Sequence, residues 1–298
     1  MVEVRNLVKT YDGFTALNGL NLSVPRGAVY GLLGKNGAGK SSTIRHIAGI
    51  YRQDSGTVTV SGEPVFENPG VKEKIAYIPD EIFYYTQATA EDMKQLYSSI
   101  YPHFSTERYH RLGKELGIGG KRPIRKLSKG MQKQEAFRLA LSCCPELVLL
   151  DEPVDGLDPV MRRELWGILL AEVAERGTTV LLSSHNLREL EDVCDHVGIM
   201  DQGKMLLEHS LEELQSSVVK VQAVFKEGAV LPQGQNILSV TASGRLQQIV
   251  LRGTAADAQA IIAPLNPVYM DVLPLTLEEI FIYELGGAEH EIKNTLLQ

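Results

Sequence analysis

Cysteine is scarce in this sequence and follows no recognisable pattern. The three cysteines, Cys143, Cys144 and Cys194, are odd in number and lack the spacing of a metal site. A disulfide framework needs cysteines in pairs, and a zinc site needs closely spaced ligand pairs. The sequence therefore indicates a protein of a reducing compartment, the cytosol.

Long apolar runs and an excess of positive charge are also missing. No apolar run approaches the roughly 20 residues needed to cross a bilayer, and the first residues lack the basic start and apolar segment of a signal peptide. The 30 Lys and Arg residues against 37 Asp and Glu residues give a net charge of −7. This balance argues against broad binding to nucleic acid and against adhesion to anionic lipid. We expect that, if the protein works at a membrane, another protein holds it there.

The bulk composition is that of an ordinary globular protein. The chain has 298 residues, of which 44% are hydrophobic and 22% are charged. This length is typical of about two domains and allows a sizeable core. No internal repeat or low-complexity segment interrupts the chain.

The most informative stretch is Gly34-Lys35-Asn36-Gly37-Ala38-Gly39-Lys40-Ser41, which follows an apolar run at 28–33. A strand that leads into a glycine-rich loop ending in Gly-Lys-Ser, with a helix after it, is typical of a phosphate-binding loop. The glycines let backbone N–H groups point at a phosphate, and the helix N-terminus adds its positive field. Lys40 supplies a charge for the β- and γ-phosphates, and Ser41 supplies a hydroxyl for Mg²⁺. This motif predicts nucleotide binding without saying how the nucleotide is used.

The pattern around this loop predicts an α/β fold. Short strands are expected at 2–4 and 20–24, with Tyr11 in the loop between them, and a helix follows the phosphate loop at 42–50. Further strands are expected at 56–62, 75–78, 147–150 and 179–183, and a helical insert at 89–116. Continuous apolar strands that alternate with helices indicate a parallel sheet covered on both faces.

The composition changes after about residue 210. Strands are expected at 218–225, 237–242 and 246–251, and helices at 255–263 and 277–285. The sequence therefore predicts a main domain over residues 1–215 with a helical subdomain at about 85–145, a small α+β domain at 216–285, and a flexible tail at 286–298.

A second motif places two carboxylates at the end of an apolar strand. Asp151 and Glu152 follow 147–150, where ligands bind at the edge of a parallel sheet. Asp151 can hold Mg²⁺, and Glu152 can orient and deprotonate a water aimed at the γ-phosphate. The alternative from this segment alone is a buried strand followed by a solvated acidic turn.

The order of the remaining motifs resembles the nucleotide-binding subunit of ATP-binding-cassette transporters. Leu127-Ser128-Lys129-Gly130-Met131-Gln132 precedes Asp151, Pro153-Val154-Asp155-Gly156-Leu157-Asp158 follows it, and His185 ends the next strand. The resemblance covers about residues 1–215. It implies a P-loop ATPase core with an antiparallel β subdomain and a helical subdomain.

The resemblance also implies a role for each matching residue. Tyr11 matches the aromatic that stacks on adenine, Ser128 and Gly130 the signature loop, and Asp158 the loop that crosses a dimer interface. Glu152, His185 and Lys40 match the catalytic residues, and Ser41, Asp151 and Asp80 are the candidate magnesium ligands. The expected nucleotide-binding residues are Tyr11, Gly34, Asn36, Gly37, Ala38, Gly39, Lys40, Ser41, Ser42, Ser128, Gly130 and Asp158.

Such a site needs two subunits. The phosphate loop and the signature helix of one subunit face apart, so two subunits, identical or paralogous, pack head to tail with ATP between them. Loss of γ-phosphate contacts after hydrolysis then loosens the dimer. The implied partner is a separate membrane permease, and the implied location is the inner face of the cell membrane.

Two positions depart from the family pattern. Lys129 and Met131 replace residues of the usual Ser-Gly-Gly-Gln signature, a variant that resembles the subgroup paired with drug, antibiotic and peptide exporters. Lys129 either adds charge near the phosphates or points to solvent. Asp80 stands where the family commonly has Gln, and a carboxylate cannot donate a hydrogen bond as that Gln does.

The aromatics after Asp80 have two readings. Phe83, Tyr84 and Tyr85 lie where the family receives a short helix of its membrane partner, or they are core residues of the helical insert.

Three functions are compatible with these motifs. The leading hypothesis is an ATPase that drives an exporter, which the Leu-Glu-Glu-Ile-Phe segment at 277–281 also favours by resemblance. An importer ATPase with a regulatory tail and a soluble cassette ATPase acting on ribosomes or DNA are the alternatives.

Overall fold

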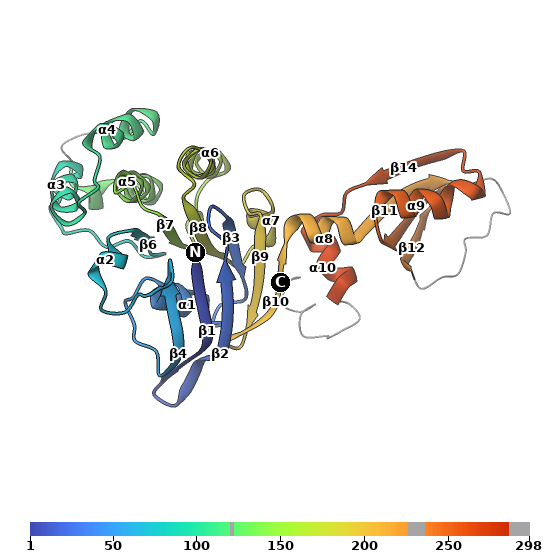
Figure 1. Ribbon diagram of the computed structural model, residues 1–298. Helices are drawn as coiled ribbons and strands as arrows, with labels where there is room; N and C mark the ends of the chain where they lie inside the picture. The colour runs from blue at the N-terminus through green and yellow to red at the C-terminus, as the bar shows by residue number, and fades with distance from the viewer. Residues whose placement is uncertain (120–121, 226–235, 286–298) are drawn as a thin grey trace. The chain divides into compact units, whose positions relative to one another are not determined.

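The phosphate loop lies in the first of two units into which the backbone divides. The computed structural model describes residues 1–119, 122–225 and 236–285 (Figure 1). The first unit comprises Met1–Asn186 and Val193–Glu208, and the second comprises Leu187–Asp192 and His209–Gln298. The predicted tail at 286–298 lies outside the described residues.

An antiparallel sheet opens the first unit. Strands β1 (Val2–Tyr11) and β2 (Phe14–Val24) form a long hairpin, and β4 (Ser55–Val60) and β5 (Glu63–Pro64) complete the order β2-β1-β4-β5. Asp12 and Gly13 connect the hairpin with positive φ angles of 46° and 84°, as the twist of paired strands requires. The expectation that Tyr11 lies in a loop was therefore wrong, because this turn needs only two residues and Tyr11 ends β1.

A second sheet carries the phosphate loop. Its order is β10-β9-β3-β8-β7-β6, and β3, β6, β7, β8 and β9 pair in parallel. The register aligns Leu33 with Ser184 and Asp151 with Ser183, so the carboxyl ends of three strands meet at one edge. The strands are β3 (Val29–Leu33), β6 (Ile75–Ile78), β7 (Leu147–Asp151), β8 (Thr179–Ser184), β9 (His196–Asp201) and β10 (Lys204–Ser210).

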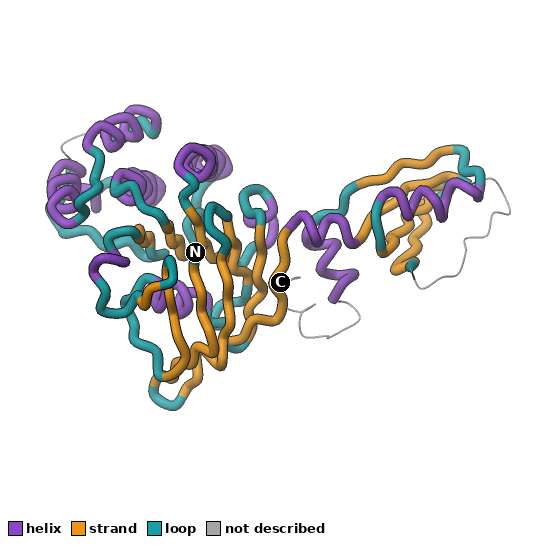
Figure 2. The backbone as a smooth tube through the Cα atoms, viewed as in Figure 1, coloured by secondary structure: helices purple, strands orange, loops and turns teal. Residues whose placement is uncertain are grey.

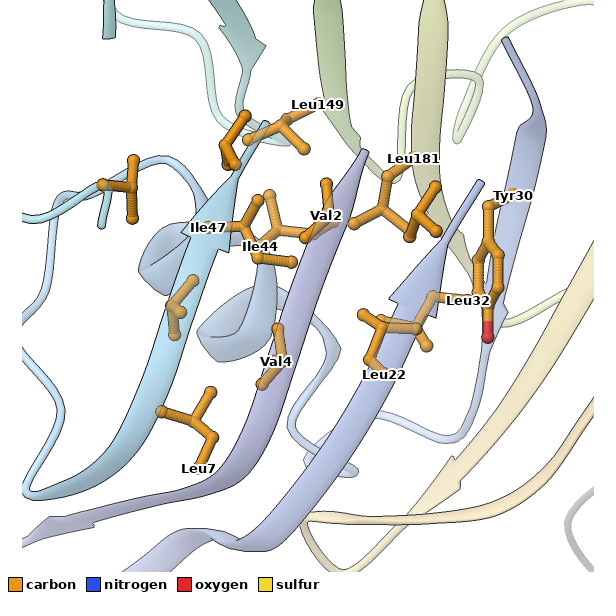
Figure 3. Packing of buried hydrophobic residues seen from close by; sticks show 14 of the residues in the cluster. Val2, Val4, Leu7, Leu22, Tyr30, Leu32, Ile44, Ile47, Leu149 and Leu181 are labelled. Carbon is orange, nitrogen blue, oxygen red and sulfur yellow. The ribbon is translucent and has the colours of Figure 1, made fainter. Parts of the chain in front are cut away.

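Helix α1 (Lys40–Ile47) joins the two sheets through a common core. Ile44 and Ile47 are fully buried and lie among Val2, Leu149 and Leu181, as Figure 3 shows. Burying such side chains contributes about 1.5–3 kcal/mol each. The core thus fixes the start of α1, and with it Lys40 and Ser41, against the sheet.

A helical layer surrounds a separate small core. Tyr84, Met93, Tyr109, Ile124 and Leu139 are buried there. Thr89 and Asp92 form a capping box at the N-terminus of α3 (Ala90–Ile100). The helices of this layer and its neighbours are α2 (Pro69–Lys72), α3 (Ala90–Ile100), α4 (Thr106–Glu115), η1 (Ile124–Lys126), α5 (Lys129–Ser142) and α6 (Pro159–Arg176).

The second unit is a sheet of order β12-β13-β11-β14 with a helix packed on it. Figure 2 shows α9 lying along the strands, and Ala258 and Ile262 of α9 are buried against Val221 and Ile249. Its elements are α7 (Leu187–Glu191), α8 (Leu211–Ser217), β11 (Val218–Val224), β12 (Ile237–Ser243), β13 (Leu246–Arg252), α9 (Ala255–Ile262), η2 (Ala263–Leu265), β14 (Tyr269–Leu273) and α10 (Leu277–Leu285). The predicted fold class, an α/β cassette with an antiparallel subdomain, a helical subdomain and a further α+β portion, is confirmed.

Candidate nucleotide-binding site

The phosphate loop leaves the end of β3 and enters α1. Gly37 and Gly39 have φ angles of 87° and 105°, which favour glycine. A Cβ on Gly39 would lie 2.9 Å from the carbonyl oxygen of Ala16. No side chain caps the N-terminus of α1, so its first N–H groups can serve an anion.

Lys40 is buried at the start of α1, with 5% of its surface exposed. Its ammonium donates to the carbonyl oxygens of Gly34 at 2.6 Å and Lys35 at 3.3 Å. The same nitrogen lies 3.3 Å from Oε1 of Glu152. A nucleotide phosphate would compete with this carboxylate for Lys40.

Asp151 is the acidic centre of the site and is 1% exposed. Its Oδ1 accepts from the hydroxyls of Ser41 at 2.9 Å and Ser183 at 2.7 Å. Its Oδ2 is buried and has no hydrogen-bond partner among the described residues. A buried carboxylate oxygen without a partner is costly, and an oxygen-ligated divalent cation would supply that partner.

Within the described part of the chain, no group of three or more His, Cys, Asp or Glu side chains could hold a metal ion. A cation beside Oδ2 of Asp151 would have the Asp151 carboxylate and the Ser41 hydroxyl within reach and would complete its shell with other oxygens, such as those of water and phosphate.

The Glu152 carboxylate contacts both Lys40 and His185. Oε2 of Glu152 lies 3.0 Å from Nδ1 of His185, and the Glu152 backbone N–H donates to the Ser183 hydroxyl at 3.0 Å. Glu152 has a φ of 46°, in the left-handed region. The turn after β7 thus directs this carboxylate toward Lys40 and His185.

Asp80 lies at the rim of the same pocket. Its Oδ1 is 4.0 Å from Nζ of Lys133. Partial burial raises the pKa of the Asp80 carboxyl, with the negative charges of Asp151, Asp155 and Glu152 adding to the rise and Lys133 opposing it. Acidic neighbours therefore surround Asp80, and Lys133 is its cationic contact.

Part of this set lines one pocket of about 360 Å³, which does not include the predicted Gly34, Ala38, Asp151 and His185. It brings together most of the predicted residues of the phosphate loop with Tyr11, Asp80 and Glu152. The lining comprises Tyr11, Phe14, Ala16, Lys35, Asn36, Gly37, Gly39, Lys40, Ser41, Ser42, Asp80 and Glu152.

Tyr11 also lines this pocket. Its ring meets the Tyr51 ring edge-on with centroids 6.0 Å apart, and Nζ of Lys9 lies 5.4 Å from the ring centre. Contacts of this kind hold an aromatic platform in place. Phe14, 66% exposed, adds a second aromatic side chain to the lining.

The predicted signature and interface residues do not line this pocket. Ser128 caps α5 and accepts from the Met131 N–H at 3.3 Å. Asp158 caps α6 and accepts from the Val160 and Met161 N–H groups, each at 3.0 Å. Gly130 packs so closely on Met161 that a Cβ would collide with that side chain. One chain therefore brings together the phosphate and carboxylate residues but not the signature residues.

The aromatics that follow Asp80 divide between surface and core. Tyr84 is 3% exposed and donates its hydroxyl to the Gln132 carbonyl oxygen at 3.0 Å. Phe83 and Tyr85 are 76% and 63% exposed, with ring centroids 5.9 Å apart. Tyr84 is therefore a core residue of the helical layer, and contact with a membrane partner stays a prediction for Phe83 and Tyr85.

Several residues of the site were missed in the sequence, Ala16 and Lys35 of the pocket lining among them. Ser183 bridges Asp151 and Glu152, Lys133 contacts the turn after β7, and Phe14 lines the pocket. Only the position of Ser183, at the end of a strand beside the carboxylates, gave any signal. In the sequence, Lys133 looks like an ordinary solvent-exposed lysine in a polar stretch of a helix.

The fold and this site define a nucleotide-binding ATPase of the P-loop type. A family profile described as "ABC transporter" matches residues 17–155. The ABC transporter ATP-binding protein YtrB of Bacillus subtilis is 33% identical over 96% of this chain and 99% of its own length. The linearmycin resistance ATP-binding protein LnrL of Bacillus subtilis is 36% identical over 69% of this chain and 68% of its own length.

A solved structure described as the ATP-binding subunit of an ABC transporter is 29% identical, with a TM-score of 0.65 over 72% of this chain and 92% of that one. The chain belongs to the ABC transporter family, as an ATP-binding subunit that hydrolyses ATP. Within the described residues, no helix has the length and apolar character needed to cross a membrane.

Proposed function

We propose that this chain is the ATPase subunit of an exporter of drugs, antibiotics or peptides. The observation that carries ATP hydrolysis is the pocket lined by Lys40, Ser41 and Glu152, with the Asp151 carboxylate bound to the Ser41 hydroxyl. The direction of transport is supported by the resistance function in the name of LnrL and by the Lys129-Gly130-Met131 form of the signature.

In the proposed reaction, Lys40 binds the β- and γ-phosphates and Glu152 orients and deprotonates the attacking water. His185, 3.0 Å from the Glu152 carboxylate, holds that carboxylate and contacts the γ-phosphate. Mg²⁺ held by Ser41 and Asp151 supplies charge neutralisation for the phosphates. Asp80 is a third candidate ligand at the pocket rim.

The proposed complete site contains two ATPase subunits, identical or paralogous. Ser128, Gly130 and Asp158 lie outside the pocket of their own chain. A head-to-tail dimer would bring Ser128 and Gly130 of one subunit to the ATP of the other and place Asp158 at the interface. ATP would then form part of the interface, and its hydrolysis would loosen the dimer.

A membrane permease is the proposed second partner. Exposed Phe83 and Tyr85 give this chain an aromatic surface next to Asp80 for a segment of that permease. The chain would then be a cytoplasmic protein held at the inner face of the membrane. The division into domains at 1–215, with its helical subdomain at 85–145, and 216–285 stays a prediction.

The proposal is tested with inverted membrane vesicles that contain the chain and the membrane protein that co-purifies with it. ATP should drive substrate into these vesicles. Transport out of inverted vesicles would indicate an importer, and recovery of the chain with ribosomes instead of membranes would indicate a soluble cassette ATPase.

A further inference from the structure

Glu152 has a backbone conformation that non-glycine residues avoid. Its φ of 46° lies in the left-handed region, where such a residue costs on the order of 1–3 kcal/mol. The turn that holds Glu152 must therefore be stabilised by its surroundings. Two groups from distant parts of the chain contact its backbone.

The first group is Ser183, which accepts the Glu152 N–H. The second is Lys133 of α5, whose ammonium donates to the carbonyl oxygens of Glu152 at 3.0 Å and Asp155 at 3.1 Å. The side chain of Lys133 is 11% exposed. Hydrogen bonds from an ammonium are stronger than those between neutral groups. Because Lys133 binds the carbonyl oxygens of both Glu152 and Asp155, it fixes the two ends of the turn relative to each other.

Lys133 also connects this turn to the segment that begins at Asp80. Its Nζ lies 4.0 Å from Oδ1 of Asp80. The preceding residue, Gln132, accepts a hydrogen bond from the Tyr84 hydroxyl at 3.0 Å. The first turns of α5 therefore contact both the Asp80–Tyr84 segment and the turn of Glu152.

We propose that Lys133 is a positioning residue for ATP hydrolysis, which holds the left-handed turn at Glu152 so that its carboxylate faces the phosphates. This inference rests on the proposed role of Glu152 as general base. Lys133 also makes the turn responsive to movements of the Asp80–Tyr84 segment, because the same ammonium faces Asp80.

The test is a double-mutant cycle in the full-length chain with Lys133→Met and Glu152→Gln. Lys133→Met should lower kcat by roughly 10–100-fold, the effect of losing hydrogen bonds to a charged group, and should leave KM for ATP unchanged. In single-turnover assays, Lys133→Met should cause no further loss once Glu152 is Gln, since Lys133 acts through that side chain.

Lys114→Met is the matched control, because Lys114 is an exposed lysine of α4 in the same helical layer; it should keep wild-type kcat and KM. If Lys133→Met does not fold, Lys133→Leu serves in the same cycle, since its side chain also has no donor for the two carbonyls.

Three results would overturn the inference: wild-type kcat in Lys133→Met, a rise in KM that accounts for the whole loss, or losses that multiply in the double variant. Wild-type turnover in Glu152→Gln would instead refute the general base itself. A deficit in Glu152→Gln with full activity in the Lys133 variant would refute only the role of Lys133.

Discussion

Ser183→Ala should damage both stability and catalysis, because one hydroxyl organises both carboxylates of the site. Ser183 is fully buried at the end of β8. Its hydroxyl donates to Asp151 at 2.7 Å and accepts from the Glu152 N–H at 3.0 Å. Losing a bond to a charged group and leaving a buried N–H without a partner each cost roughly 1–3 kcal/mol.

These losses are not additive, so we expect a decrease of about 2–4 kcal/mol in the free energy of unfolding. If about 1.4–2.8 kcal/mol of stabilisation is also lost from the transition state of ATP hydrolysis, kcat decreases roughly 10–100-fold. Urea unfolding measures the first quantity, and steady-state ATP hydrolysis measures the second.

The matched control is Thr179→Val at the other end of β8. Thr179 is also fully buried, and its hydroxyl accepts the Gly27 N–H at 2.8 Å. Thr179→Val should lower the free energy of unfolding by about 1–3 kcal/mol, because the Gly27 N–H loses its partner, while leaving kcat unchanged. Wild-type turnover in Ser183→Ala, or an equal loss of turnover in both variants, would refute the reasoning.

Three further predictions concern catalysis, binding and pH. Glu152→Gln should lower turnover roughly 10²–10⁴-fold while ATP binding persists, and near-normal turnover would contradict its role as base. Lys40→Ala should weaken binding of a fluorescent ATP analogue in titrations, because Lys40 is the buried cation of the phosphate pocket; unchanged affinity would contradict this. Hydrogen bonds from Thr254 lower the pKa of the Asp257 carboxyl in the folded protein below its usual value of 3.8. The ionised carboxylate therefore stabilises the folded state fully above pH 3.8. This contribution is lost as the pH falls through the lower pKa of the folded protein. Urea unfolding from about pH 5 to about pH 3 should show less decline in Asp257→Asn than in wild type, and identical profiles would speak against this contribution.

The features that depend on spacing within a few residues were predicted well. The loop at 34–41 connects β3 to α1, Asp151 ends β7 with Glu152 directly after it, and, in the second unit, α10 spans Leu277–Leu285 as expected. The roles assigned to the individual site residues stay predictions. The structure shows in addition that the Ser41 hydroxyl donates a hydrogen bond to the Asp151 carboxylate at 2.9 Å.

The missed features depend on contacts between distant segments. Ser183 reaches Asp151 because β7 and β8 are neighbours in register, and residue periodicity does not determine strand order. Lys133 was not recognised because a lysine in a polar helix ordinarily lies in solvent. Tyr11 was placed in a loop because the Asp12-Gly13 turn signal was not used.

The central proposal is that ATP completes an interface between two copies of this cassette or between it and a paralogue. Sedimentation velocity of the purified Glu152→Gln chain, in which bound ATP should persist, tests it most directly. We predict a dimer with ATP and Mg²⁺ and a monomer with ADP. A chain that binds ATP and stays monomeric at every protein concentration, alone and with the paralogous subunit that co-purifies with it, would contradict the account.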